Sequence, residues 1–469
     1  MVFSSTVFLM MFLPAVWLIH AAIPKKFLGA RNFFLSVASL LFYAYGEPVY
    51  IILMLASVLF NYVFAIAIDR FRGKFNTFLC GIAIAINLGM LGVFKYSPWL
   101  VSMLNSATGA ELPVPDLVIP VGISFYTFQI LSYVIDVKRR TTPVQKNFFD
   151  LLLYVSFFPQ LIAGPIVKYN DIDEQIRSRT ITSDGCALGI RRFIYGLSKK
   201  VLVSNTAAII ADAAFGTSDA GSAFAWAGAI CYCIQLYFDF SGYSDMAIGL
   251  ASMFGFRLNE NFNYPYSAVS IRDFWKRWHI SLTSWFREYV YFPLGGNRCG
   301  KARTIFNRIF VFFLTGLWHG ANFTFVIWGM WHGLLMMFEQ LVGFDRIASK
   351  KYLQPFTRLY TLLAVCLGFV VFRASDISSA FAYIGNMFSF GGGLTDILHL
   401  LSPYTCFMII FGLVFSMPIL PELGEFGKKH PKLGTAGNIA GFIICIPLLV
   451  LCIMSLASSS FNPFIYYHF

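Results

Sequence analysis

Two histidines in one apolar stretch are the residues of this chain best suited to chemistry. His319 and His332 lie between Leu314 and Glu339, in a segment rich in Trp and Phe. An ionisable side chain at membrane depth is costly and usually marks a functional site. Imidazole titrates near neutral pH and can act as a general base. The stretch therefore favours activation of a hydroxyl group for attack on a thioester, with a structural role for each histidine, bonded to carbonyl groups, as the alternative.

The spacing of the two histidines separates their expected roles. They are thirteen residues apart, so on one straight helix their rings would be about 20 Å apart and could not act on the same atom. They meet only if the chain folds back at Gly320. His319 lies between Gly316 and Gly320, and glycines allow the backbone to approach a ligand closely. We therefore expect His319 to carry the chemistry and His332 to support it or to line a channel.

Two carboxylates form a second unusual feature. Asp239 and Asp245 lie deep in an apolar run without Lys or Arg, where an acidic group normally faces a cavity or a partner. Their six-residue offset is about 600° of helix rotation, so they point to different sides unless Gly242 unwinds the helix. At most one of them is expected to orient a histidine. A structural role, bonding helix ends, stays open.

A basic, aromatic segment follows, with the sequence IRDFWKRWHISLTSWFREYVYFPLGGNR. Arg272 and Arg277 alternate with tryptophans, which is typical of an interfacial helix that contacts lipid headgroups. The tight turn ending in Arg298 equally suits an anionic nucleotide-containing donor such as coenzyme A. Sequence alone leaves both interpretations open. No metal, nucleotide-loop or serine-nucleophile motif occurs.

Composition indicates what must position these residues. Hydrophobic residues make up 58% and charged residues 12%, against about 25% charged in soluble domains. The chain is therefore expected to be an all-α polytopic membrane protein. Its net charge of +12 is explained by basic cytoplasmic loops, so nucleic acid is not expected as a partner. The nine cysteines are scattered and predict no disulfide framework, and the first apolar run is expected to be an uncleaved anchor.

Two segments depart from a simple pattern of crossings. Residues 147–167 are apolar but contain Pro159, Gly164 and Pro165, so we expect a re-entrant segment that lines the site. Residues 257–308 are too polar to cross and are expected to lie on the cytoplasmic interface. We otherwise expect one integral-membrane domain over residues 1–469.

Several motifs resemble the membrane-bound O-acyltransferase family, and within it the membrane subunits of alginate O-acetylation. They are MVFSSTVFL, PVGISFYTFQ, FPQLIAGPI, QLYFDFSGYSDMAIGL, FWKRWHISLTSWFREYVY, PLGGNR, GLWHGAN, WGMWHG and FNPFIYY. The resemblance implies a bundle of about 11 to 12 transmembrane helices in a bacterial inner membrane. It also implies acetyl transfer from a cytoplasmic thioester, acetyl-CoA or another, to an extracytoplasmic polysaccharide. Gln160 stands where the alginate branch has histidine, which leaves the polymer open.

The resemblance completes the set of expected site residues. They are His319 and His332 as catalytic residues, Asp239, Asp245, Asn322, Trp318 and His279 as supporting residues, and Arg272, Arg277 and Arg298 as donor-binding residues. No metal and no tightly bound cofactor is expected. Expected partners are a serine-hydrolase-like extracytoplasmic protein, polysaccharide synthesis and export machinery, and membrane lipid. The aromatic tail from Phe461 to Phe469 is a candidate dock for the first.

Two other functions fit the residues. An exporter or channel for a glycan or lipid would use the intramembrane His and Asp residues to line its path, without acyl chemistry. A partner-independent acyltransferase would modify a lipid or a peptidoglycan precursor directly.

Overall fold

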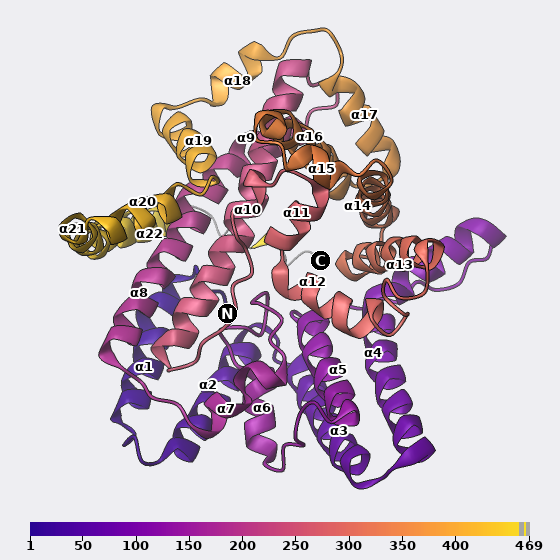
Figure 1. Cartoon of the computed structure of the whole chain (residues 1–469), viewed down its shortest axis with the longest axis vertical. Helices are drawn as coiled ribbons and strands as arrows, with labels where there is room; N and C mark the ends of the chain where they lie inside the picture. Colours follow the sequence, from indigo (N-terminus) through magenta and orange to yellow (C-terminus); the bar gives the residue numbers. More distant parts are fainter. Residues whose placement is uncertain (459–463, 466–469) are drawn as a thin grey trace. The chain divides into compact units, whose positions relative to one another are not determined.

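The computed structural model describes residues 1–458 and 464–465, all of them in helices or connecting segments (Figure 1). They form two compact units. Unit 1 comprises residues 1–193 and 246–259, and unit 2 comprises residues 194–245 and 260–469. Two helices, α8 (Ser183–Ser198) and α10 (Ser222–Met253), have residues in both units. The expectation of an all-helical protein is confirmed for the part of the chain that the structure describes.

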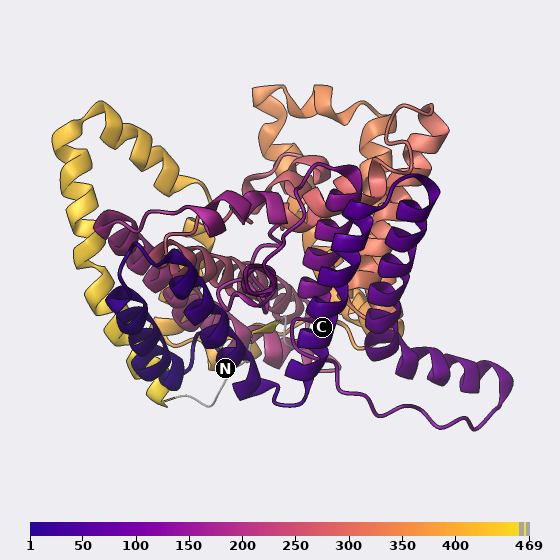
Figure 2. The ribbon, with the colours of Figure 1, turned by 90° about the horizontal axis from the view of Figure 1, so that it is seen from below.

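Unit 1 is built from a series of long apolar helices. Its elements are η1 (Phe8–Phe12), α1 (Leu13–Ala22), α2 (Leu28–Gly46), α3 (Tyr50–Arg70), α4 (Gly73–Thr108), α5 (Ile123–Arg139), α6 (Phe148–Ser156) and α7 (Tyr169–Arg177). α2 packs on α6, and α3 and α4 pack on α5. Pro98 lies inside α4, where it removes a backbone hydrogen bond. The last turns of α4 leave the direction of its first part (Figure 2).

The segment 147–167 is helical only in its first half. α6 ends at Ser156, and the remaining residues through Val167 continue without a regular helix although they are buried. Gln160 is fully buried, and its side-chain amide donates to the Tyr154 carbonyl oxygen over 2.7 Å. An irregular buried backbone is what the prolines and Gly164 favour. Re-entrance from one membrane face stays a prediction.

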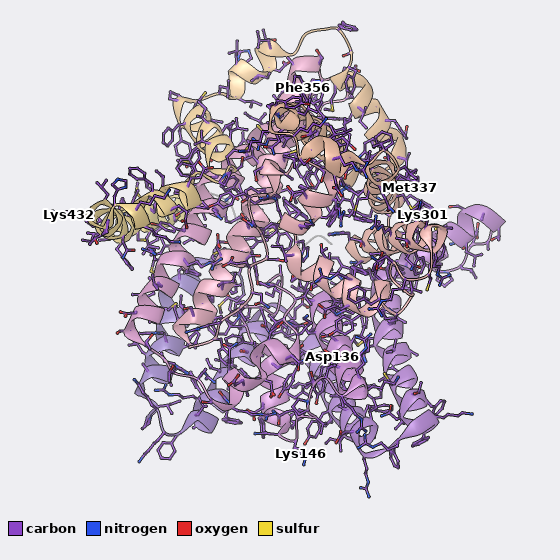
Figure 3. All side chains as sticks on the ribbon, in the orientation of Figure 1. Asp136, Lys146, Lys301, Met337, Phe356 and Lys432 are labelled. Atoms are coloured by element: carbon purple, nitrogen blue, oxygen red, sulfur yellow. The ribbon has the colours of Figure 1, made fainter. Side chains whose placement is uncertain are left out.

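Unit 2 contains the apolar stretch from Leu314 to Glu339 with His319 and His332. Its elements are η2 (Lys199–Ser204), α9 (Asn205–Phe215), η3 (Pro265–Ser267), α11 (Ile271–Arg277), α12 (Ile280–Phe286), η4 (Arg287–Tyr291), α13 (Lys301–His319), α14 (Phe323–Leu341), α15 (Phe344–Ala348), η5 (Lys351–Leu353), α16 (Gln354–Arg373), α17 (Ile377–Met387), α18 (Leu394–Leu400), α19 (Pro403–Phe415), α20 (Ile419–Lys429), α21 (Pro431–Ile443) and α22 (Cys445–Ser458). α13 packs on α14, and α14 packs on α16. Side chains fill the spaces between the ribbons (Figure 3).

Five helices among the described residues are long and apolar enough to cross a membrane. They are Tyr50–Arg70, Gly73–Thr108, Ser222–Met253, Lys351–Arg373 and Pro431–Ser458. A sixth span results if the bent pair α18 and α19 counts as one. The protein is therefore multi-pass, but the expected 11 to 12 spans are not reached by length and composition. Other apolar runs form shorter helices, such as α6, or helices with polar ends, such as α13.

Residues 257–308 contain only short helices before α13 begins. α11 and α12 have seven residues each, too few to span a bilayer that needs about 20. Two backbone positions of this region are unusual, because Tyr264, just before η3, and His279, between α11 and α12, have positive φ values of 47° and 45°. A cytoplasmic, interfacial position for this region remains the prediction of the positive-inside rule.

Candidate active site

The chain folds back directly after His319. α13 ends at His319, and α14 begins at Phe323 and packs against α13. A Cβ on Gly316 would lie 2.4 Å from the Phe325 carbonyl oxygen, and a Cβ on Gly329 would lie 2.3 Å from the Phe312 carbonyl oxygen. Only glycine permits this close crossing of the two helices. The straight-helix arrangement does not occur, and the fold-back at Gly320 brings the two histidines together.

His319 lies in an aromatic enclosure at the C-terminal end of α13. Its side chain is 2% exposed, and its ring centroid lies 5.0 Å from Trp318, 5.0 Å from Trp328 and 5.1 Å from Phe372. A helix C-terminus carries partial negative charge, which stabilises a positive charge developing on imidazole. Low exposure excludes competing water. Both features suit a base that takes up a proton during a reaction.

His332 lies in the middle of α14 and contacts the same tryptophan. Its ring centroid is 5.3 Å from Trp328, 5.4 Å from Trp275 and 6.2 Å from Phe274. The side chain is fully buried, and neither ring nitrogen has a hydrogen-bond partner among the described residues. Such buried unsatisfied groups are rare and often mark a place that another molecule occupies. The carbonyl-bonded alternative does not apply to His332.

His279 approaches this cluster through Trp318, whose ring lies 5.9 Å from its own. The His279 Nδ1 lies 3.3 Å from the Asn261 Oδ1, which also accepts from the Ser281 backbone N–H. Because the Asn261 oxygen can only accept, Nδ1 carries the ring proton and Nε2 keeps a lone pair. Burial lowers the pKa of His279 to about 3, so the ring is neutral. Its positive φ adds backbone strain, which clusters at functional sites.

The two carboxylates form ion pairs with neighbouring lysines of η2. Lys200 Nζ lies 2.5 Å from Asp239 Oδ1, and Lys199 Nζ lies 2.6 Å from Asp245 Oδ2. α10 stays helical at Gly242, where a Cβ would lie 2.8 Å from the Gly196 carbonyl oxygen. The glycine therefore permits close packing and does not unwind the helix. In this structure the carboxylates serve the contact between α10 and η2.

Asn322 caps the helix that follows the fold-back. Its Oδ1 accepts from the Thr324 backbone N–H over 3.1 Å, and its Nδ2 donates to the Ser375 carbonyl oxygen over 2.7 Å. Side-chain oxygens at this position satisfy a helix N–H that lacks an intrahelical partner. Asn322 thus positions the start of α14 next to His319, and a direct role in the reaction stays a prediction.

The three arginines expected to bind the donor do not form a free cluster. Arg272 lies 2.8 Å from Asp345, and Arg277 lies 3.1 Å from Asp273. Arg298 is exposed in the turn before α13. Their role in donor binding is not established by these contacts, and two of them are neutralised by aspartate.

Sequence reasoning missed several residues that shape this region. Asn261 orients His279, and Glu339 accepts hydrogen bonds from the backbone N–H groups of Ile271 and Arg272 at the start of α11. A carboxylate at a helix N-terminus is favourable because of the partial positive charge there. The pair Lys199-Lys200 was visible as the lysine dipeptide that most closely precedes α10, and its charge could have been matched to the two aspartates. No sequence signal identifies Asn261.

The described part of the C-terminal tail is anchored within unit 2. The Ile465 backbone N–H donates to Asp239 Oδ2 over 2.9 Å. Phe464 is 1% exposed, lies under Lys200 Nζ at 4.9 Å and packs on Tyr243. Phe464 is therefore buried and is not available as a docking surface. The remaining residues of the candidate dock, 461–463 and 466–469, lie outside the described residues.

Comparison with known proteins assigns the chain to a family. The model of the membrane-bound O-acyltransferase family matches residues 136–375, which include His279, His319 and His332. A probable alginate O-acetylase of Pseudomonas putida is 38% identical over 100% of this chain and 100% of its own length. Another, from Pseudomonas aeruginosa, is 42% identical over 83% of this chain and 75% of its own length. A peptidoglycan O-acetyltransferase of Helicobacter pylori is 32% identical over 84% of this chain and 80% of its own length. Because the family model matches about half of the chain and the similarity to relatives extends over its whole length, this protein belongs to the membrane-bound O-acyltransferases and is an O-acyltransferase of the membrane.

Proposed function

We propose that the protein is an O-acetyltransferase that takes an acetyl group from a cytoplasmic thioester and delivers it for O-acetylation of an extracytoplasmic polysaccharide. The observation that carries this proposal is the position of His319, buried in an aromatic enclosure at the end of α13. The bacterial inner membrane is the proposed location, with 11 to 12 spans in total. The alginate O-acetylases of Pseudomonas support a polysaccharide acceptor of the same kind.

The reaction requires one base and one leaving group. The acceptor hydroxyl oxygen attacks the thioester carbonyl carbon while His319 takes up the hydroxyl proton. The new C–O bond forms, the C–S bond breaks, and the proton passes to the leaving thiolate, which restores neutral His319. The partial negative charge at the end of α13 stabilises the imidazolium that exists between these steps. Trp318 and Trp328 exclude water, which would otherwise hydrolyse the thioester.

His332 and His279 support this base from two sides in the proposal. His332 shares the Trp328 ring with His319, and His279 reaches His319 through Trp318. Neutral His279, with its proton held at Nδ1 by Asn261, presents Nε2 as an acceptor. Asp239 does not contact the reacting groups in this proposal. Its role is to hold α10 against η2 through the ion pair with Lys200.

A separate extracytoplasmic protein of the serine-hydrolase type is proposed to receive the acetyl group. Transport without acyl chemistry is disfavoured by membership of an acyltransferase family. The peptidoglycan O-acetyltransferase of Helicobacter pylori supports a second acceptor class, a peptidoglycan glycan. Acetylation of isolated polymers of both kinds, measured in membranes that contain the chain and the extracytoplasmic partner, distinguishes the two acceptor classes.

The test replaces His319 and follows labelled acetyl groups. Membranes that contain His319→Ala and the extracytoplasmic partner should transfer no acetyl from acetyl-CoA to a polysaccharide acceptor, because attack by an unactivated hydroxyl is slow; the wild-type chain in the same membranes should transfer it. His430→Ala is the matched control, since His430 is exposed in the segment between α20 and α21. Protein level and detergent stability are compared for both variants. Transfer at the wild-type rate by His319→Ala would refute the assignment.

A further inference from the structure

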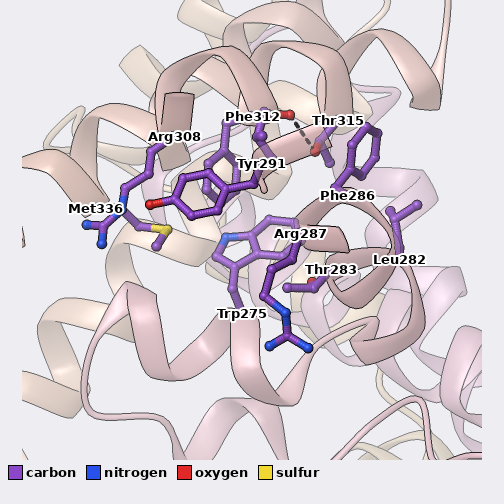
Figure 4. Close-up of a pocket in the computed structure, with 11 residues that line it drawn as sticks. Trp275, Leu282, Thr283, Phe286, Arg287, Tyr291, Arg308, Phe312, Thr315 and Met336 are labelled. Atoms are coloured by element: carbon purple, nitrogen blue, oxygen red, sulfur yellow. Dashed lines mark hydrogen bonds between the residues drawn. The ribbon is translucent and has the colours of Figure 1, made fainter. Parts of the chain in front are cut away.

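A cluster of basic side chains lies in unit 1, where α1 ends and α2 begins. We name it the α1–α2 basic cluster, and its members are His20 in the last turn of α1, Arg31 near the start of α2, and Arg179 between α7 and α8. The proposed acetyl transfer uses none of these residues. The cavity of about 160 Å³ in unit 2 (Figure 4) belongs instead to the candidate active site, because Trp275 lines it and packs on His332.

Contacts with Phe254 and Asn32 bring the three side chains of the cluster together. Arg179 Nε donates to the Phe254 carbonyl oxygen over 3.0 Å, and the His20 ring packs edge-on against the Phe254 ring with centroids 5.1 Å apart. Arg179 Nη1 donates over 2.6 Å to the side-chain oxygen of Asn32, which follows Arg31 in α2. Burial and the neighbouring charge of Arg31 lower the pKa of Arg179 to about 10. Both guanidinium groups are therefore charged at neutral pH and close enough to repel each other.

The hydrogen bonds of the two arginines go to neutral groups. Arg31 Nε donates over 2.9 Å to the Ile23 carbonyl oxygen at the end of α1, and Arg179 donates to carbonyl and amide oxygens. The carboxylate of Asp150 is held by the Asn32 amide nitrogen over 3.2 Å, so the amide group separates it from Arg179. Charges that are bonded to neutral acceptors keep their attraction for an anion. The cluster is therefore suited to an anionic ligand.

Two nitrogen atoms of the cluster have no hydrogen-bond partner in the part of the chain that the structure describes. They are Arg179 Nη2 and His20 Nε2, both buried, and the His20 side chain as a whole is 2% exposed. Native proteins rarely leave buried polar atoms unsatisfied, and such atoms often mark the place of another molecule. A phosphate group has several acceptor oxygens, and guanidinium binds them with charge-assisted hydrogen bonds. The chemistry of the ligand is therefore that of a phosphate.

The surface beside the cluster indicates where this phosphate comes from. The turn between α1 and α2 exposes Lys25, Lys26 and the aromatic ring of Phe27, and the positive-inside rule predicts that it is cytoplasmic. On the last turns of α1, Leu18 and Ile19 are exposed. A soluble phosphate has no use for this apolar surface, whereas the acyl chains of a lipid cover it. Basic residues at the cytoplasmic end of membrane helices bind anionic lipid headgroups in this way.

We propose that the α1–α2 basic cluster binds the phosphate of an anionic glycerophospholipid of the cytoplasmic leaflet. Arg31 and Arg179 hold the phosphate, and the acyl chains lie along Leu18 and Ile19. A zwitterionic lipid also has a phosphate, but its ammonium group is repelled by the lysines of the turn between α1 and α2. The bound lipid connects α1, α2 and the segment before α8 and supplies the acceptors that the buried nitrogens lack. This site goes beyond the proposed function, because the lipid is neither donor nor acceptor of the acetyl group.

Lipid binding to delipidated full-length protein in detergent, measured by native mass spectrometry, tests the site independently of acetyl transfer. The probes are phosphatidylglycerol, phosphatidylcholine with the same acyl chains, and glycerol 3-phosphate. The wild type should bind phosphatidylglycerol more tightly than the other two. Arg179→Gln should weaken phosphatidylglycerol about three- to tenfold, because charge-assisted hydrogen bonds are lost, and leave phosphatidylcholine unchanged. Arg72→Gln, at an exposed position between α3 and α4 of the same unit, is the matched control and should keep the wild-type affinity.

Three outcomes would overturn the inference. Wild-type affinity for phosphatidylglycerol in Arg179→Gln excludes the cluster as its site. Equal affinities of the wild type for phosphatidylglycerol and phosphatidylcholine exclude selection of an anionic headgroup. Glycerol 3-phosphate that displaces phosphatidylglycerol at equal concentration shows a site for a soluble phosphate and contradicts the lipid. If Arg179→Gln elutes as aggregate in size-exclusion chromatography, Lys25→Gln combined with Lys26→Gln replaces it; this variant changes exposed side chains only and should weaken phosphatidylglycerol about threefold.

Discussion

Replacing Asp239 with Asn should destabilise the protein much more than replacing Asp245. Asp239 and Lys200 are 1% and 3% exposed and lie 2.5 Å apart, so Asp239→Asn leaves a buried ammonium without its counter-charge. Asp239 also holds the Ile465 backbone N–H. Breaking a buried ion pair by removing one partner costs about 3–5 kcal/mol.

The neighbouring pair provides an internal control. Lys199 and Asp245 have the same chemistry and a similar distance, 2.6 Å, but are 31% and 19% exposed. Water screens such a pair, so Asp245→Asn should cost about 1 kcal/mol or less. Lys200→Met combined with Asp239→Leu removes both charges of this pair, and the double variant should recover most of the lost stability because apolar replacements of buried pairs are often neutral.

Thermal unfolding in detergent, followed by intrinsic tryptophan fluorescence, measures the four proteins side by side. The expected order of melting temperature is wild type, then Asp245→Asn and the double variant, then Asp239→Asn well below them. Equal melting temperatures for the two single variants would refute the reasoning from burial. If Asp239→Asn keeps the wild-type melting temperature but loses acetyl transfer, Asp239 has a direct role in the reaction.

Three further predictions concern the site. Gly320→Ala should reduce acetyl transfer and lower the free energy of unfolding by about 1–3 kcal/mol, because the new Cβ would lie 2.2 Å from the Phe325 ring. Gly437→Ala is the control, since a Cβ there has no atom within 4 Å, and it should change neither quantity. Equal effects of the two substitutions would contradict the contact. Asn322→Ala should cost about 1 kcal/mol and Asn322→Ser should retain the cap and the activity; loss of transfer in both, at normal stability, would assign the amide a chemical role. Acidification from pH 6.5 toward pH 3 should destabilise the folded state through His279, because the unfolded chain binds a proton in this range that the buried ring, with its pKa of about 3, does not bind. The melting temperature of His279→Gln should therefore fall less between pH 7 and pH 5 than that of the wild type. An identical fall in both proteins would exclude His279 as a cause of the acid destabilisation.

The class of protein and the importance of the histidine stretch follow from composition and local pattern, whereas the partners within the site do not. Apolar runs predict membrane helices because lipid demands them, and the glycines around His319 indicated a close approach of backbone. The pairing of Lys200 with Asp239 depends on how η2 packs on α10. These two elements are separated in the sequence by α9 and a turn, so local pattern does not predict the contact. Asn261 and Trp275 act through such contacts too, and residues of these types occur throughout the chain.

The fold-back at Gly320 explains why two histidines that share Trp328 differ chemically. His319 ends a helix, where unpaired carbonyl groups stabilise a positive ring, while His332 lies in mid-helix, where the carbonyl groups around it are bonded along the helix. A positive charge that develops on a ring is therefore better stabilised at the end of α13 than in the middle of α14. The Trp275 ring packs on His332, with centroids 5.4 Å apart, and adds an apolar wall beside the second histidine.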